Sequence, residues 1–461
     1  MTISDTDYQI WLTDIGQQRT ILVEMHHAAG VEYIANVAYI SLPTDTNANR
    51  IYDDVLNEAV DIESRLDGDY SLGEITIIND GSLNTWLANK WAGHEIRLYL
   101  GAKNWSLDDF RRVALAVNGG IDDVSPGVIR FAIRDPKALF DQSLQNTLLP
   151  SGLPAPITLG QPFNVLPALT DDSTHEYQVN DDTITSALVR DNGVVVSHIT
   201  DYANGKYTLT ARPQGNLGVD VIEANTTAKE IINWVCTRQG KTAVQTTLNA
   251  LPTYAMGLHY NNQLTAEQVL DDVCLSIGAY WRVNAAGEVE VHQLVEPAMT
   301  ADLVITADDM LANGLRLVSV EPPIKTLTMN YDRNFGPVSR NSLAGMLDSN
   351  PTLAEKLTAN WQQVTATNVL TEYPLAADQT IDSYIVGTAD VQTECDRIAA
   401  LRGVRREVWA VECFLAPAQI HVQQTVQLFN PRFGFATGKN ALVIAVNRGY
   451  TRNKVELEVW L

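Results

Sequence analysis

The chain has 461 residues, which suggests roughly three domains, and its 45% hydrophobic and 19% charged residues are typical of a folded protein and argue against global disorder. Asp and Glu number 55 against 32 Lys and Arg, so the formal net charge is −23. This balance argues against a surface that grips nucleic-acid phosphates and against docking on anionic lipid, since both need clustered basic residues.

The sequence shows no targeting or membrane-spanning segment. The start, Met1-Thr2-Ile3-Ser4-Asp5, lacks the basic residues and the apolar run of a signal peptide. The longest uninterrupted apolar run, Ala441 to Val446, is far shorter than the roughly 18 to 20 residues of a spanning helix. We therefore expect a protein made in the cytoplasm with no integral membrane segment.

The four cysteines, Cys236, Cys274, Cys395 and Cys413, form no C-x-x-C pair. Cys236 and Cys274 lie on the apolar faces of expected helices. We expect buried free thiols rather than disulfides or a metal site.

The first 145 residues have the alternating pattern of strands. Apolar residues recur at every second position around 75–77 and 96–100, with turn signals at 79–81 and 92–93. Ser106-Leu107-Asp108-Asp109 fits either a helix-opening capping box or a tight turn before a strand. We favour the turn, followed by a strand from Val113 to Val117 that Gly119-Gly120 ends. A further strand, 128–134, leads into Asp135-Pro136.

A proline-rich stretch follows, from Leu148 to Pro167. Because proline removes a backbone donor and resists both helix and central strand, we expect a linker or a clamp that lies across another surface. Beyond it, 184–196 reads as a hairpin whose turn, Asp191-Asn192-Gly193, tolerates positive φ. The alternation continues through Tyr207, Leu209 and Ala211.

Two helices with marked starts come next. Thr227 with Glu230, and Thr265 with Gln268, have the spacing of capping boxes, and Gly278 is placed to stop the second helix. A hairpin over 280–294 follows, so residues 225–320 form a helix-then-strand module that ends near Pro322-Pro323.

The last segment begins with a strand at 327–331. Helices are expected over 352–363 and 389–401, the second ended by Gly403, and strands over 408–415, 441–447 and 455–460. The fold class is therefore α+β and multidomain, built mainly on antiparallel sheet. We predict four ranges: a β-barrel or sheet domain at 1–147, a proline-rich arm with a β-hairpin domain at 148–225, an α+β module at 226–322, and a second β-barrel-like domain with helices at 323–461.

No pattern nominates a catalytic, cofactor or metal site. The loop from Gly434 to Asn440 superficially resembles a phosphate-binding loop, but its spacing is wrong and no Ser or Thr follows Lys439, so we interpret it as a turn between strands. His26 and His27 point to opposite faces if they lie on a strand, and so do not share a metal ion. His292 with Glu288 and Glu290 shares one strand face but lacks further ligands.

Acidic doublets and tryptophans leave two alternatives open. We expect most of the doublets to be solvated loop or cap residues, although paired carboxylates for glycoside cleavage are set in space rather than in sequence. Trp86, Trp91 and Trp105 fit strand packing better than a sugar platform. The doublets are Asp53-Asp54, Asp122-Asp123, Asp171-Asp172, Asp181-Asp182, Asp271-Asp272 and Asp308-Asp309.

Four stretches follow one another in a consistent order along nearly the whole chain. They are Gly68-Asp69-Tyr70-Ser71-Leu72-Gly73 with Ile78-Asn79-Asp80-Gly81 and Trp91-Ala92-Gly93; Leu159-Gly160-Gln161-Pro162-Phe163-Asn164-Val165 with Tyr177-Gln178-Val179 and Arg190-Asp191-Asn192-Gly193; Leu264-Thr265-Ala266-Glu267-Gln268-Val269-Leu270 with Gly278-Ala279-Tyr280-Trp281; and Asn430-Pro431-Arg432-Phe433-Gly434-Phe435 with Gly438-Lys439 and 455–460. In this order, the four stretches resemble the baseplate or tail-tip hub family of long-tailed bacteriophages.

This resemblance implies tail-tube-like β-barrel domains that close into a ring around a channel, usually as a homotrimer. It also implies a structural, non-enzymatic virion protein that joins the tail tube and distal tail proteins to tip or fibre proteins, while DNA passes through without specific binding. No tail-lysozyme motif is present, so peptidoglycan cleavage is not implied.

Two alternatives and one hypothesis accompany this interpretation. The alternatives are a distal tail or fibre-attachment protein, and a carbohydrate-active enzyme with an unrecognised carboxylate pair. The hypothesis is that part of the acidic charge lines the channel and repels DNA during passage; otherwise the acidic residues serve solubility on outer surfaces.

Overall fold

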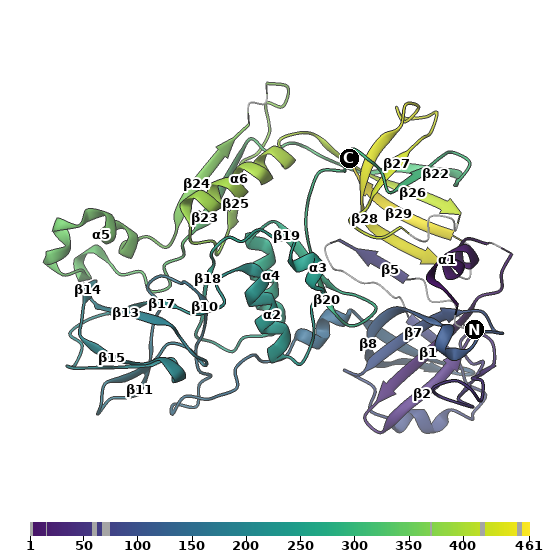
Figure 1. Ribbon diagram of the computed structural model, residues 1–461, viewed down its shortest axis with the longest axis horizontal. Helices are drawn as coiled ribbons and strands as arrows, with labels where there is room; N and C mark the ends of the chain where they lie inside the picture. The colour runs from purple at the N-terminus through teal and green to yellow at the C-terminus, as the bar shows by residue number, and fades with distance from the viewer. Residues whose placement is uncertain are drawn as a thin grey trace.

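Antiparallel strands make up most of the chain in the computed structural model, which describes residues 3–14, 16–57, 62–66, 74–368, 371–414, 420–449 and 454–461. Strands hold 41% of the residues and helices 18%, and the largest sheets are curled half-barrels. The predicted class, multidomain α+β on antiparallel sheet, is therefore confirmed. Figure 1 shows an elongated molecule with two curled sheets at one end, a β arm at the other, and helices between them.

The first curled sheet comes from the N-terminal part of the chain and has the order β2-β1-β7-β8-β9-β6. The alternating residues Ile75, Ile77, Ile96, Leu98 and Leu100 are all buried in it, as predicted. A short helix, α1 (Asp5–Thr13), precedes the sheet and was not predicted. The strands are β1 (Thr20–His27), β2 (Gly30–Ala35), β6 (Glu74–Ile78), β7 (Glu95–Gly101), β8 (Arg111–Ser125) and β9 (Val128–Arg134), with β3 (Tyr39–Ile40) paired to β4 (Ile51–Tyr52) beside them.

The turn at Ser106 is confirmed, but the predicted strand end at Gly119-Gly120 is wrong. The Ser106 side chain accepts a hydrogen bond from the backbone of Asp108, and β8 then runs on through the two glycines to Ser125. The strand register shifts between Asn118 and Gly120. Gly120 has φ +102°, and a side chain at Gly119 would meet Ala132, so the pair forms a bulge that bends the strand instead of ending it.

The second curled sheet uses the C-terminal strands. Its order is β21-β27-β28-β29-β26-β22, and β5 (Ile62–Arg65), from the N-terminal part, also pairs with β28. Buried residues of both curled sheets join in one apolar cluster, for example Ile96 and Phe131 with Val443 and Trp460. The strands are β21 (Leu303–Ile305), β22 (Met310–Glu321), β26 (Arg406–Phe414), β27 (Thr425–Leu428), β28 (Lys439–Gly449) and β29 (Lys454–Trp460). The predicted strands at 408, 441 and 455 are thus confirmed, although Leu415 lies outside the described residues.

The helical module has its own apolar cluster, which gathers residues from Leu115 to Ala399. Both predicted capping boxes are present, with Thr227 and Glu230 opening α2 (Ala228–Arg238) and Thr265 and Gln268 opening α4 (Ala266–Ser276). The other members are α3 (Gln245–Leu248), α6 (Thr388–Arg402), the hairpin β19 (Ala279–Val283) and β20 (Val289–Gln293), the pair β10 (Ile157–Gly160) and β18 (Gly257–Tyr260), and the sheet β24 (Gln362–Thr367), β23 (Thr326–Tyr331) and β25 (Gln379–Asp382).

The arm is a small β unit with its own core around Val189, Tyr207 and Val219. The predicted hairpin is confirmed, because Asn192 and Gly193 both have positive φ between β13 and β14. One sheet holds β11 (Ala168–Asp171), β12 (Glu176–Gln178), β16 (Lys206–Leu209) and β15 (His198–Asp201); the other holds β14 (Val194–Val195), β13 (Ser186–Asp191) and β17 (Leu217–Ile222).

Two predictions need correction, one for the proline-rich stretch and one for the helix expected over 352–363. The proline-rich stretch is not only a linker, because the gap between Pro156 and Pro162 holds the fully buried strand β10. The helix expected over 352–363 is shorter: α5 (Pro351–Thr358) begins at the Asn350 cap, and the residues after it form β24.

The four predicted domain ranges remain a prediction. Each of the two largest apolar clusters draws residues from more than one of those ranges. Within the described part of the chain, no helix is long and apolar enough to cross a membrane.

Candidate functional site

The most exposed strand of the curled C-terminal sheet is β22, which lies at the edge of that sheet. Its last six residues, 316–321, are all exposed, although alternate residues of a packed strand are normally buried. Three of these residues are large and apolar: Leu317 is 46% exposed, Val318 43% and Val320 41%. We call residues 316–321 the β22 edge.

The backbone of the β22 edge is paired on one side only. Its antiparallel partner is β26, with Arg316 opposite Ala410 and Glu321 opposite Arg406. A register shift between Leu317 and Ser319 marks a bulge at Val318. On the other side the edge has no strand partner among the residues that the structure describes. Outward N–H and C=O groups along such an edge are a template for another strand.

Two other sheet edges, those of β6 and β2, are covered by the chain's own backbone. At β6, the amide of Ile78 donates to the carbonyl of Val55 at 2.7 Å, and the amide of Asn57 donates to the carbonyl of Thr76 at 2.9 Å. At β2, Ile34 bridges to Asp53. These contacts show how the chain caps an edge, and the β22 edge has no such cap among the described residues.

A cavity of about 390 Å³ lies over the C-terminal sheet between β22 and β5 and reaches residues of the β22 edge. Val318 and Ser319 line it together with Trp460 and Tyr280. Arg65, which lies 3.2 Å from Glu458, forms part of its charged rim. A strand added at the β22 edge would therefore have apolar surface next to it as well as free peptide groups.

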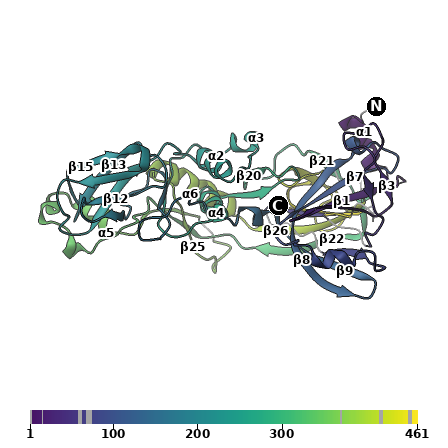
Figure 2. The same cartoon turned by 90° about the horizontal axis from the view of Figure 1, so that it is seen from below.

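The arm carries a second set of exposed apolar side chains, spread over both of its sheets. Ile199 on the edge strand β15 is 71% exposed. The group is Leu169, Leu188, Val195, Ile199, Tyr202 and Ile222. The two groups lie on different units, at opposite ends of the elongated molecule (Figure 2).

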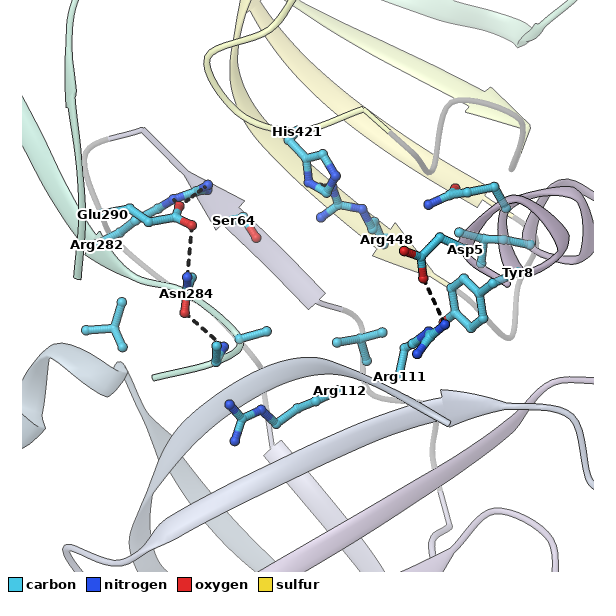
Figure 3. Close-up of a pocket in the computed structure, with 16 residues that line it drawn as sticks. Asp5, Tyr8, Ser64, Arg111, Arg112, Arg282, Asn284, Glu290, His421 and Arg448 are labelled. Carbon is cyan, nitrogen blue, oxygen red and sulfur yellow. Dashed lines mark hydrogen bonds and ion pairs between the residues drawn. The ribbon is translucent and has the colours of Figure 1, made fainter. Parts of the chain in front are cut away.

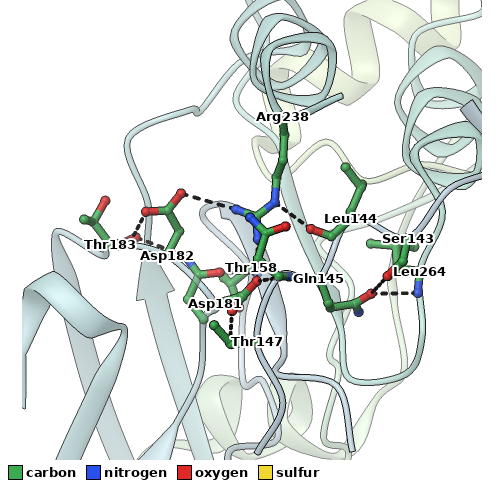
Figure 4. Close-up of polar contacts among 12 residues, drawn as sticks. Ser143, Leu144, Gln145, Thr147, Thr158, Asp181, Asp182, Thr183, Arg238 and Leu264 are labelled. Atoms are coloured by element: carbon green, nitrogen blue, oxygen red, sulfur yellow. Dashed lines mark hydrogen bonds and ion pairs between the residues drawn. The ribbon is translucent and has the colours of Figure 1, made fainter. Parts of the chain in front are cut away.

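A polar junction fixes the arm to the helical module (Figure 4). Arg238 of α2 forms an ion pair with Asp181, whose side chain is only 1% exposed, and lies 3.6 Å from Asp182. The Arg238 side chain also donates to the carbonyl of Leu144 at 2.5 Å. Asp181 accepts further hydrogen bonds from the backbone of Asn146 and the hydroxyl of Thr147. The acidic doublet 181–182 is thus a structural anchor rather than a solvated loop pair.

The doublet Asp271-Asp272 also has structural partners. Asp271 accepts from the Trp281 indole at 2.6 Å, and Asp272 accepts from the Tyr260 hydroxyl at 2.6 Å. Burial raises the pKa of Asp272, and the hydrogen bond from Tyr260 opposes that shift. Both carboxyls border a cavity of about 510 Å³, but each is held by an aromatic donor.

The tryptophans pack inside the molecule, as the sequence favoured. Trp86 and Trp91 are buried with ring centroids 5.5 Å apart, and Trp91 packs edge-on against Phe131. Trp105 lies elsewhere, 4.5 Å from Trp11 of α1. The three rings therefore do not form one platform.

The candidate histidines are also dispersed. His27 packs on Trp91 at 4.8 Å, while burial lowers the pKa of His26 on the same strand. His292 lies 3.7 Å from Glu290, whose main partner is Arg282 at 2.8 Å. Among the described residues, no three His, Cys, Asp or Glu side chains are placed to hold a metal ion.

Two further sequence interpretations can be located. The loop from Gly434 to Asn440 joins β27 to β28, as expected for a turn between strands. All four cysteines are buried free thiols, and burial raises the pKa of Cys236 and Cys413 to about 12. The stretch 68–73 and the residues Met1 and Thr2 lie outside the described residues.

The sequence analysis missed the β22 edge. The run Leu315-Arg316-Leu317-Val318-Ser319-Val320 has the β-branched, alternating character of a strand. It was assigned to the end of the helical module because Pro322-Pro323 follows it. Only the three-dimensional pairing with β26 shows that it belongs to the C-terminal sheet and lies at its border.

No protein-family model matches the chain, and no curated protein matches it either. Solved structures do resemble it at low identity. The 43 kDa tail protein of prophage MuSo2 from Shewanella oneidensis is 11% identical with a TM-score of 0.46, over 96% of this chain and 98% of that one. A tail protein from Neisseria meningitidis MC58 is 10% identical with a TM-score of 0.45, over 96% of each chain. The prophage tail protein gp18 from Listeria monocytogenes EGD-e is 8% identical with a TM-score of 0.41, over 96% of this chain and 94% of that one.

All three of these structures are tail proteins.

Proposed function

We propose that this chain is a structural, non-enzymatic protein of a phage tail, and that it assembles through open strand edges. The observation that carries the proposal is the β22 edge, with six consecutive exposed residues and one free side. An uncapped edge with exposed apolar side chains invites uncontrolled pairing unless an assembly covers it. The resemblance of the sequence stretches to tail hubs supplies the class of assembly.

The finer role that we propose is a baseplate or tail-tip hub. In this role copies of the chain form a ring, a homotrimer in the family it resembles, that joins the tail tube and distal tail proteins to tip or fibre proteins. DNA leaves through the ring without specific binding, and an acidic lumen would repel it. The chain would then reside in the virion tail.

Labelling of particles tests the location. We expect gold-conjugated antibody against the full chain to mark the distal end of tails in electron micrographs of particles from the source strain. A chain absent from those particles would contradict the proposal. Labelling along fibres alone would instead favour the fibre-attachment alternative.

Self-association tests the role of the edge. We expect the mass of the full chain, measured by sedimentation over a concentration series, to rise toward that of a small ring. The double variant Val318→Lys and Val320→Lys should shift this rise to at least tenfold higher concentration, because buried charge and lost apolar contact oppose strand addition. Leu375→Lys is the matched control, since Leu375 is 95% exposed and lies outside every described strand.

A further inference from the structure

Lysine ion pairs differ chemically from the arginine ion pairs of the same molecule. In the cavity of about 460 Å³ in Figure 3, Arg111 faces Asp5 and Arg282 faces Glu290. A guanidinium stays protonated in proteins and does not attack a carboxyl group. A lysine amine can lose its proton and act as a nucleophile. A lysine held against a buried carboxyl group therefore has the components of an amide bond.

One ion pair of the molecule has this arrangement. Lys356 of α5 places its Nζ 2.5 Å from Oδ2 of Asp332, the residue directly after β23. The Asp332 side chain is only 12% exposed, and that of Lys356 is 33% exposed. The buried ring of Phe163 lies over the amine, with its centroid 4.0 Å from Nζ. The two groups are thus in direct contact, with no room for water between Nζ and Oδ2.

Backbone contacts fix both partners of this pair. The amide of Asp332 donates to the carbonyl of Ile385 at 2.9 Å. Two residues further along, the buried side chain of Asn334 donates to two carbonyls near the end of α5, that of Lys356 at 3.1 Å and that of Leu357 at 2.9 Å. The segment that carries the acid is therefore tied to the helix that carries the amine. Such positioning removes the entropy cost of bringing two reacting groups together.

The state of the Asp332 carboxyl separates this pair from a comparable one. Burial raises the pKa of Asp332, Lys356 opposes the shift, and Asp220 adds to it. In the arm, Lys206 lies 2.9 Å from Glu176, and its hydrogen bond lowers the pKa of that carboxyl. The surroundings of Asp332 therefore favour the neutral acid, which an amine attacks. Glu176 is instead held as a carboxylate, which resists attack.

We propose that Lys356 and Asp332 join in an intramolecular amide bond. A proton passes from Nζ to Oδ2, the neutral amine attacks Cγ, and Oδ2 leaves as water with two of the three protons of the original ammonium group. One ammonium and one carboxylate thus become one amide and one water molecule, and no oxidant, metal or nucleotide is consumed. This site does not depend on the proposed assembly role.

The bond would close a loop from 332 to 356 and tie α5 to the end of β23. A covalent closure of this kind restricts the unfolded chain, as a disulfide does. Helix α5 packs against Phe163 through Ala354 and Leu357, so the bond would also hold the apolar contact between this helix and the start of the arm. The cysteines do not supply such a closure, because all four are free thiols.

The intact mass of the full chain tests the proposal. The purified chain is kept at neutral pH until its mass is constant, and it is then denatured and measured. We expect a mass lower than that of the sequence by one water molecule. Fragmentation of digested protein should place the loss on a branched peptide that joins Lys356 to Asp332.

Two variants locate the reaction. Lys356→Arg should have the full mass of its own sequence, because a guanidinium does not attack the acid. Lys206→Arg is the matched control, and it should still lack one water molecule.

Two results would overturn the assignment. One is the full sequence mass in the original protein, with the peptides around Lys356 and Asp332 recovered unbranched. The other is a loss of water that persists in Lys356→Arg, because the water would then come from another site. The peptide map of the original protein decides the question even if Lys356→Arg does not fold.

Discussion

Asp181 is the residue on which the attachment of the arm depends most. Its side chain is almost fully buried, and Arg238 is its cationic partner. We expect Arg238→Met to lower the free energy of unfolding by about 3 kcal/mol, because a buried carboxylate then lacks its counter-charge. Denaturant titration of the full chain measures this change.

The matched control is Arg212→Met. Arg212 lies 3.9 Å from Asp172, and both side chains are more than two-thirds exposed, so solvent screens the pair and less than about 1 kcal/mol should be lost. Equal losses in the two variants would show that Arg238 does not hold the arm.

His259 predicts a dependence of stability on pH. Burial lowers its pKa to about 3, with Arg333 adding to the effect. The unfolded ring takes up a proton below about pH 6.5 and the folded ring does not, so stability is lost as the pH falls from 6.5 toward 3. We expect His259→Gln to remove about 2 kcal/mol of the loss between pH 6.5 and pH 4, as measured by urea unfolding at each pH.

The half-buried His175 provides the comparison, and Asn suits its positive φ. In the His175→Asn variant, the free energy of unfolding should depend on pH as it does in the original protein. If the plots of unfolding free energy against pH run parallel for His259→Gln and the original protein, the buried imidazole does not cause the loss of stability at low pH.

At the scale of elements, strand β10 of the proline-rich stretch pairs with strand β18 of the helical module. Each of the two strands has a glycine at the same point of the pairing. Gly160 lies opposite Gly257, has φ +72°, and a Cβ there would lie 2.0 Å from the carbonyl oxygen of Met256. We expect Gly160→Ala to lower the melting temperature clearly more than Gly127→Ala, since Gly127 shares a positive φ but has open space around it. Equal shifts would show that the close approach of the strands is not required.

Elements with local signals could be predicted from the sequence. The capping boxes at Thr227 and Thr265 and the Asn192-Gly193 turn are fixed by residues at most three positions apart, and all three are present. Helix α1 was missed, although Ser4 caps it by accepting from the amide of Asp7. The buried strand β10 was not predicted. Its four residues lie between prolines, and prolines argue against a strand.

Contacts between distant segments could not be predicted. Nothing local in 62–65 indicates that β5 pairs with β28, or that 316–321 lies at a sheet border. The sequence therefore predicted the class of the fold and several elements, while the β22 edge required the structure.

At the scale of the whole molecule, the two ends of the chain share one apolar cluster, and the segments between them form the module and the arm. This leaves the arm extended away from the curled sheets (Figure 2). Exposed Ile199 of the arm and the β22 edge thus lie far apart, and in the proposed assembly one copy would present separate surfaces to separate neighbours. Such an arrangement suits a component that links different parts of an assembly.

A density map of the assembled particle, resolved well enough to trace strands, tests the central proposal most directly. We predict that an additional strand from a neighbouring chain lies hydrogen-bonded along residues 316–321, with the neighbouring cavity at Val318 and Trp460 covered. A map in which this border of the sheet faces open solvent in every copy would contradict assembly through the β22 edge.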